Sequence, residues 1–305
     1  MLTELTNYMK LANNGQSLDA KKMLDMFDNA NNPFAKVYAK KLKDKCAPAD
    51  VQIFENYMRA LASTSQSKTA GKNGVAGVVT SLDGSKKYFC DEKGFEHIQT
   101  IEKGLMGAVL YYQATSIYLE SDKMNVDNLT VTVGEGTQME HHWDESFGYF
   151  GAPQTFPLVK DGERFFAKYA SARDAMLKCN TLIMNDGFLK GRAAIAAKKL
   201  DIRDEAIKTV REQWEKIIAS TAISYLNGSR KDFLDDALRN HQLSEAVAFI
   251  NMLKHNPTRK ISDTQIQALT NKIGNNLYET TPAQILEARD ELSKIMNLEI
   301  LREQF

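Results

Sequence analysis

The chain has 305 residues, which is long enough for one large domain or two smaller ones. Its 39 lysines and arginines equal its 39 aspartates and glutamates, so no net charge attracts it to nucleic acid or an acidic membrane surface. The three cysteines are widely spaced, which argues against a disulfide framework and against a CxxC metal motif.

The pattern of apolar residues predicts a mostly helical chain with one β-hairpin. Helical spacing runs from Leu2 to Met58, with a break at Asn-Asn-Pro (31–33). A polar loop over 63–73 leads into two β-prone runs joined by Asp-Gly, which predicts a hairpin within 74–91. Helices are then expected over 96–120, from about 138 to Pro153, and over 164–186, 187–200, 203–227, 232–254, 262–276 and 281–301. Gly228 is the predicted stop of the helix over 203–227.

Two of the predicted helices carry the same polar pattern, one hundred residues apart. Each has a histidine, a glutamate four residues later and a small residue three beyond that. On an α-helix these positions form one stripe, so an imidazole lies beside a carboxylate. The first stripe is His141, Glu145 and Gly148, and the second is His241, Glu245 and Ala248.

The segments before the two stripes also match, which indicates an internal repeat. Tyr118-Leu119 precedes the first stripe by a loop, and Tyr225-Leu226 precedes the second. We interpret this order as an ancient duplication. The predicted fold is all-α, with two related helical bundles and a small β-hairpin excursion. Residues 1–160 form the first half and 161–305 the second, packed as one compact unit.

The repeat predicts a polar site between the two halves. Neutral histidine and glutamate both bind zinc and iron, and together they can also transfer protons. We therefore expect His141, Glu145, His241 and Glu245 to form the site and to be its metal ligands, with His142, Asp144 and Glu140 nearby. The structural alternative is a His–Glu hydrogen bond that satisfies two polar groups inside a helical seam.

Other catalytic signatures are missing from the chain. It has no HExxH, no P-loop and no GxSxG motif, and Gly134-Glu-Gly136 lacks the third glycine of a dinucleotide fingerprint.

The residues of the first stripe also carry a family resemblance. Residues 138–151, with 75–81 upstream and 237–246 downstream, resemble an uncharacterised family of bacterial lipoproteins that is similar to the imelysin-like proteins. Imelysin-like proteins share a fold of two related helical bundles and a His-x-x-Glu signature. This signature maps onto His142 and Glu145, whereas the repeat pairs Glu145 with His141. In addition, Glu140 stands where the signature usually has glycine.

The resemblance implies a function and a location. Several imelysin-like proteins occur in iron-uptake systems, and the group was first classed as metallopeptidases. We expect an exported binding protein linked to the uptake of iron or another metal, with iron or zinc as the bound ion. The alternatives are a zinc-dependent hydrolase of the imelysin type, whose catalytic residues the sequence does not assign, and a structural seam in a partner-binding protein.

The resemblance also implies a periplasmic or cell-surface lipoprotein. Its lipid anchor and leader are expected to lie outside this numbering. A metal ion, a small ligand or other envelope proteins are the expected partners, and nucleic acid is not.

Overall fold

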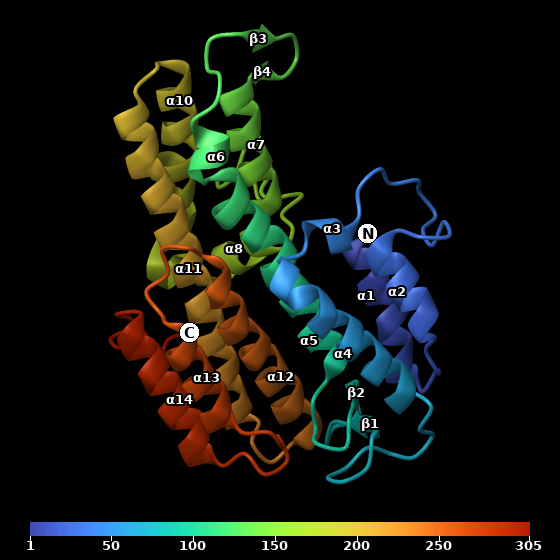
Figure 1. The fold of residues 1–305 in the computed structure, drawn as a ribbon. Coiled ribbons are helices and arrows are strands. Elements are labelled where there is room, and N and C mark those ends of the chain that lie inside the picture. Colours follow the sequence, from blue (N-terminus) through green and yellow to red (C-terminus); the bar gives the residue numbers. More distant parts are fainter.

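The computed structural model describes residues 1–305 and is mainly helical (Figure 1). The label η marks short 3-10 or π-helical segments. The first half contains α1 (Leu2–Met9), η1 (Lys10–Asn14), α2 (Ala20–Asp28), α3 (Leu42–Lys45), η2 (Pro48–Asp50), α4 (Val51–Thr64), β1 (Gly77–Thr80), β2 (Lys87–Cys90), α5 (His97–Leu105), η3 (Met106–Tyr111), η4 (Gln113–Tyr118), α6 (Ser121–Met124), β3 (Val131–Thr132), β4 (Gly136–Thr137) and α7 (Gln138–Phe150).

The second half contains no strand. Its elements are α8 (Phe166–Leu177), α9 (Cys179–Thr181), η5 (Leu182–Leu189), α10 (Lys190–Ala196), α11 (Leu200–Lys231), α12 (Asp236–Met252), η6 (Leu253–His255), α13 (Asp263–Ile273) and α14 (Pro282–Ile295). None of the helices combines the length and the hydrophobicity that a membrane-spanning segment needs.

The hairpin predicted within 74–91 is confirmed. Strands β1 and β2 pair antiparallel, with Gly77 opposite Cys90 and Thr80 opposite Lys87. A second, shorter hairpin, β3–β4, lies in the segment that the sequence predicts as a loop. Figure 1 shows the two hairpins at opposite ends of the molecule.

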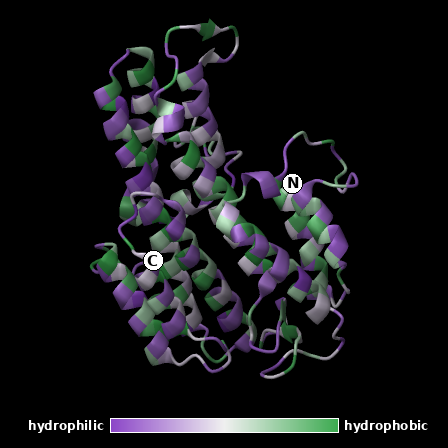
Figure 2. Cartoon of the chain, viewed as in Figure 1, coloured by the Kyte–Doolittle hydropathy of each residue, from purple (hydrophilic) through white to green (hydrophobic).

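One hydrophobic core runs through both halves. It contains 64 buried residues, and its largest members include Trp143 of α7 and Trp214 of α11. The three cysteines are buried and free. Hydrophilic and hydrophobic residues alternate along the helices in Figure 2, as expected for amphipathic helices that turn one side to a core.

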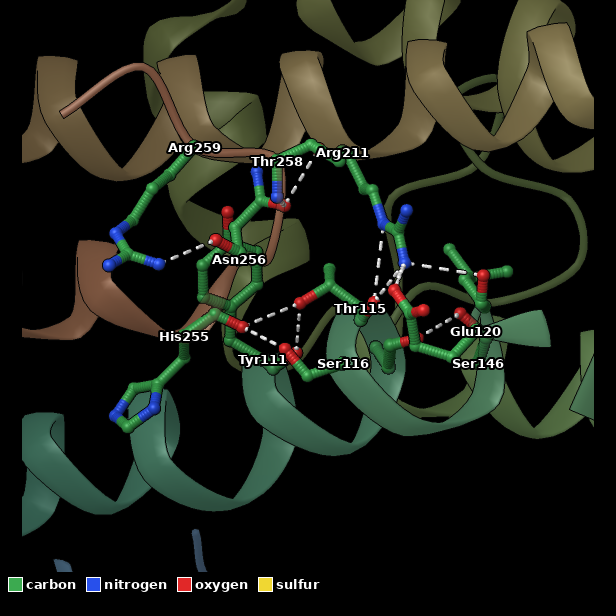
Figure 3. Close-up of polar contacts among 12 residues, drawn as sticks. Tyr111, Thr115, Ser116, Glu120, Ser146, Arg211, His255, Asn256, Thr258 and Arg259 are labelled. Carbon is green, nitrogen blue, oxygen red and sulfur yellow. Dashed lines mark hydrogen bonds and ion pairs between the residues drawn. The ribbon is translucent and has the colours of Figure 1, made fainter. Parts of the chain in front are cut away.

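A buried arginine joins the halves where the helix over 97–118 ends (Figure 3). The second part of this helix, η3 and η4, is π-helical. Arg211 of α11 donates to the carbonyl of Thr115 from Nη2 (2.6 Å) and to that of Leu119 (3.2 Å), and pairs with Glu120. Carbonyls at a helix end have no partner within the helix, so Arg211 caps this end from the second half.

Two predicted helix boundaries are wrong, each for a local reason. Helix α11 runs through Gly228, where a Cβ would lie 1.9 Å from Oε1 of Gln242 on α12. Glycine there leaves room for the side chain of Gln242, and it does not end the helix. The break predicted at 186–187 falls instead at Lys178, whose φ of 53° is left-handed and ends α8.

Candidate functional site

The first His/Glu stripe lies on α7, directly after the β3–β4 hairpin. Thr137 caps α7 by accepting a hydrogen bond from the backbone N–H of Glu140, and Glu140 accepts one in return from the backbone N–H of Thr137. This capping box satisfies two backbone N–H groups at the start of α7. Glu140 is therefore used in the helix cap.

An open pocket of about 600 Å³ lies over this stripe. His141 and Glu145 are 45% and 41% exposed, and their Nε2 and Oε1 atoms are 3.8 Å apart. Helix α7 and the β3–β4 hairpin both contribute residues to the wall of this pocket. The lining residues are Gly134, Glu135, His141, Asp144, Glu145, Gly148 and Tyr149.

The pocket carries unpaired negative charge. Arg192 of α10 pairs with Asp144 (Nε to Oδ1, 3.0 Å) and with Glu140 (Nη1 to Oε1, 2.6 Å). Burial nevertheless raises the pKa of Asp144, although Arg192 acts to lower it. Glu145 pairs only with His141, and Glu135 pairs with no cation. The pocket therefore favours a positively charged ligand.

His142 faces away from this pocket. It is 8% exposed, and its Nδ1–H donates to the carbonyl of Lys123 at 2.8 Å. Its ring lies 6.0 Å from that of Tyr118. Of the two adjacent histidines, His141 is the one that faces the pocket together with Glu145, as the repeat predicts.

The second stripe, on α12, is buried. His241 donates from Nδ1 to Oε2 of Glu96 at 2.5 Å, and its Nε2 lies 3.4 Å from Oε2 of Glu245. Tyr88 of β2 stacks on the imidazole, with ring centroids 4.0 Å apart. Burial acts to lower the pKa of His241, but the hydrogen bond to Glu96 and the two carboxylate charges outweigh it and raise that pKa.

An ammonium group of the chain itself lies at the second stripe. Lys103 of α5 has its Nζ 3.4 Å from Oε1 of Glu245 and 5.8 Å from the centroid of the Tyr169 ring. Burial raises the pKa of Glu245, although His241 and Lys103 act to lower it. Burial and the nearby Glu245 charge also raise the pKa of Tyr225. This network corresponds to the structural alternative, because it pairs His241 and Lys103 with Glu245 between α5 and α12, although Oε1 of Glu96 has no hydrogen-bond partner.

The two stripes have matching surroundings. Tyr118 precedes the first stripe, and its ring lies 5.8 Å from that of Tyr149. Tyr225 precedes the second, and its ring lies 5.7 Å from that of Phe249. Tyr149 and Phe249 each lie eight residues after the histidine of their stripe. Each half thus places a tyrosine, a histidine, a glutamate and a second aromatic ring in the same order.

The structure does not bring the stripes together. His141 lies on α7 near the β3–β4 hairpin, and His241 stacks on β2, at the other end of the molecule (Figure 1). The prediction of one shared centre made of His141, Glu145, His241 and Glu245 is therefore wrong. Helix α7 packs against η4 and α10, whereas α12 packs against α11 and α5.

The metal centre predicted from these four residues fails for the same reason. No group of three or more histidine, cysteine, aspartate or glutamate side chains is arranged to hold a metal ion. At the first stripe, Glu140 and Asp144 are bound by Arg192. At the second, Glu245 is paired with Lys103.

Sequence reasoning missed Glu96 and Lys103. Both lie far along the chain from the second stripe, and a lone glutamate or lysine in a helical run has no distinguishing pattern. Sequence reasoning also missed the Asp50–His255 pair. His255 Nε2 lies 3.1 Å from Oδ2 of Asp50, and both side chains line a small pocket of about 130 Å³.

Comparisons with known proteins identify a family but no individual relative. No curated protein and no solved structure matches the chain. The relation to imelysin-like proteins remains a prediction. One family model matches residues 1–280, and the chain therefore belongs to the family described as "Domain of unknown function (DUF4856)".

Proposed function

We propose that this chain is a binding protein whose ligand places a positively charged amino group in the pocket on α7. One observation carries the proposal. In the second half, Glu245 of the repeated arrangement pairs with the ammonium group of Lys103, which also lies over the ring of Tyr169. In the first half, Glu145 has only the exposed His141 as a partner. A ligand ammonium would take the place at Glu145 that Lys103 takes at Glu245.

The surroundings of the first stripe support this choice of ligand. Tyr149 lines the pocket beside Glu145 and offers an aromatic face, to which cations are attracted. Lys45 lies over Tyr118, with Nζ 5.8 Å from the ring centroid, but it makes no ion pair with Glu145. One carboxylate of the pocket therefore remains available to an external cation.

Iron and zinc, which the family resemblance implies, fit the pocket less well. Zinc sites in proteins use at least three protein ligands. His141 and Glu145 provide two, and Asp144 is already bound to Arg192. Both ions nevertheless belong in the test as competitors.

The test is a titration with Nα-acetyl-lysine methylamide, followed through the imidazole NMR signals of His141. We expect saturable shifts that weaken as salt is added, because the pair is partly exposed to solvent. Glu145→Gln should weaken binding by about two- to fivefold, the loss expected for one partly exposed charge pair. The matched control is Glu205→Gln, an exposed glutamate of α11 that lies outside the pocket.

Two results would overturn the proposal. One is that the neutral norleucine analogue shifts the His141 signals as much as the lysine amide does. The other is stoichiometric binding of Zn²⁺ or Fe²⁺ that depends on Glu145 and that the amine does not displace, because it would assign the pocket to a metal.

A further inference from the structure

The surface beside the α7 pocket exposes apolar side chains that the packing of the chain does not explain. Leu129, Val131 and Val133 are 81%, 67% and 97% exposed. They lie on the β3–β4 hairpin and the bend before it, and the hairpin projects from one end of the molecule (Figure 1). Three neighbouring aliphatic side chains on one projection are typical of a surface that a partner covers.

The hairpin is anchored to the helices despite its exposure. Asn128 donates from Nδ2 to the carbonyl of Ile195 at 2.8 Å and accepts a hydrogen bond from Thr137 Oγ1 at 2.8 Å. Lys198 donates to the carbonyl of Asn128. The exposed aliphatic side chains are therefore presented in a fixed position, which lowers the entropy lost when a partner binds.

The hairpin and the pocket form one continuous surface. Gly134 and Glu135, in the turn between β3 and β4, line the pocket on α7. Val133 is the first residue of this turn. A ligand held at Glu145 and passing Glu135 therefore reaches the aliphatic side chains next.

The second stripe shows what kind of group covers such a site in this fold. The ammonium group at Glu245 belongs to a protein side chain, Lys103, on helix α5. Two other residues of that helix, Ile101 and Leu105, are fully buried. A lysine side chain of a polypeptide thus occupies the stripe of the second half, on a helix whose nearby apolar residues are buried.

We propose that the α7 pocket and the β3–β4 hairpin together are a docking surface for a partner protein, which offers a lysine flanked by apolar residues. This inference rests on the proposed function, since the lysine enters the same pocket beside Glu145. The negative charge of Glu135 and Glu145 complements the lysine, and Leu129, Val131 and Val133 complement its apolar neighbours.

The test compares short synthetic peptides with the lysine amide on the full chain. One peptide has a lysine between valines and leucines, a second replaces those neighbours with serine and glycine, and a third replaces the lysine with norleucine. We expect the first to bind at least about tenfold more tightly than the second, a difference of about 1.4 kcal/mol. The third should lose most of the affinity.

Variants of the chain test whether the hairpin causes the tighter binding of the apolar peptide. The double change Val131→Thr and Val133→Thr keeps β-branched residues and should remove the advantage of the apolar peptide, with binding of the lysine amide unchanged. The matched control is Leu234→Thr, because Leu234 is 85% exposed and follows α11, away from the pocket. This variant should behave as the wild type.

The outcomes separate the two proposals. Equal binding of the first two peptides, with retained binding of the lysine amide, overturns the docking surface and leaves the proposed function standing. An advantage of the apolar peptide that survives the hairpin variant also overturns it. If the lysine amide and all peptides fail to bind, both proposals are wrong.

Discussion

Lys103 Nζ lies 3.4 Å from Oε1 of Glu245, so an ion pair joins α5 of the first half to α12 of the second. The two side chains are 11% and 6% exposed. A buried ion pair contributes little net stability, but removing one partner leaves an uncompensated charge. This relationship closes the second stripe, whereas the equivalent stripe on α7 is open to solvent.

Replacing Lys103 should destabilise the fold strongly. In Lys103→Met, Glu102 and Glu245 both lose the cation that they share, and we expect the free energy of unfolding to fall by about 3–5 kcal/mol. Urea denaturation followed by circular dichroism measures the change. Lys208→Met removes an exposed pair with Glu205 and should cost less than about 1 kcal/mol. Equal losses in the two variants would contradict the role of Lys103.

The raised pKa of His241 predicts a pH dependence of stability. Glu96 holds the pKa of His241 above the unfolded value of about 6.5. Stability from this group is therefore fully present below that value and is lost as the pH rises through the folded pKa. The difference in the free energy of unfolding between the wild type and His241→Gln should be largest near pH 6 and shrink toward pH 8.

The control for this pH dependence comes from the repeat itself. His141 is the equivalent histidine on α7, but it is 45% exposed. Denaturation of His141→Gln should show only a small difference from the wild type, because the side chain is partly exposed and its pair with Glu145 is 3.8 Å long. A difference for His241→Gln that grows with pH would mean that folding lowers the pKa of His241, and would contradict the stabilising role of Glu96.

Two glycines should respond to alanine in opposite directions. A Cβ on Gly191 of α10 would lie 2.1 Å from Cζ2 of the buried Trp143, so Gly191→Ala should cost about 1–3 kcal/mol through overpacking. A Cβ on Gly148 of α7 meets no atom within 4 Å. Gly148→Ala should therefore stabilise the chain by about 0.5–1 kcal/mol. Melting temperatures of both variants test this, and a stabilised Gly191→Ala would contradict the close packing of α10 on α7.

Loss of the Arg211 cap should weaken the contact between the halves. In Arg211→Leu, the carbonyls of Thr115 and Leu119 lose a buried donor, and we expect destabilisation by about 2–4 kcal/mol. Arg230→Leu, on the same helix, removes only an exposed pair with Glu303 at 3.9 Å and is the control. Hydrogen exchange should also become faster over residues 113–119 in Arg211→Leu alone. Unchanged exchange there would show that the cap does not hold this helix end.

The sequence alone determined the local features of this protein. Helical periodicity, the Asp-Gly hairpin and the phase of the two stripes all follow from the spacing of neighbouring residues, and the structure agrees with them. The repeat also selected His141 over His142, because only the former shares a helical face with Glu145 at a spacing of four. These features depend on interactions within a few residues, which an amino-acid pattern records directly.

The tertiary structure alone decided what each stripe faces. The two stripes have the same spacing, yet the Glu245 side chain is 6% exposed and buried against Lys103, while Glu145 is open to solvent beside the β3–β4 hairpin. Glu96, the partner of His241, lies 145 residues away in the chain. Burial and charge pairing depend on which helix packs over a stripe, and that choice is made by the whole core. The separation into one closed and one open site therefore had no local signal in the sequence.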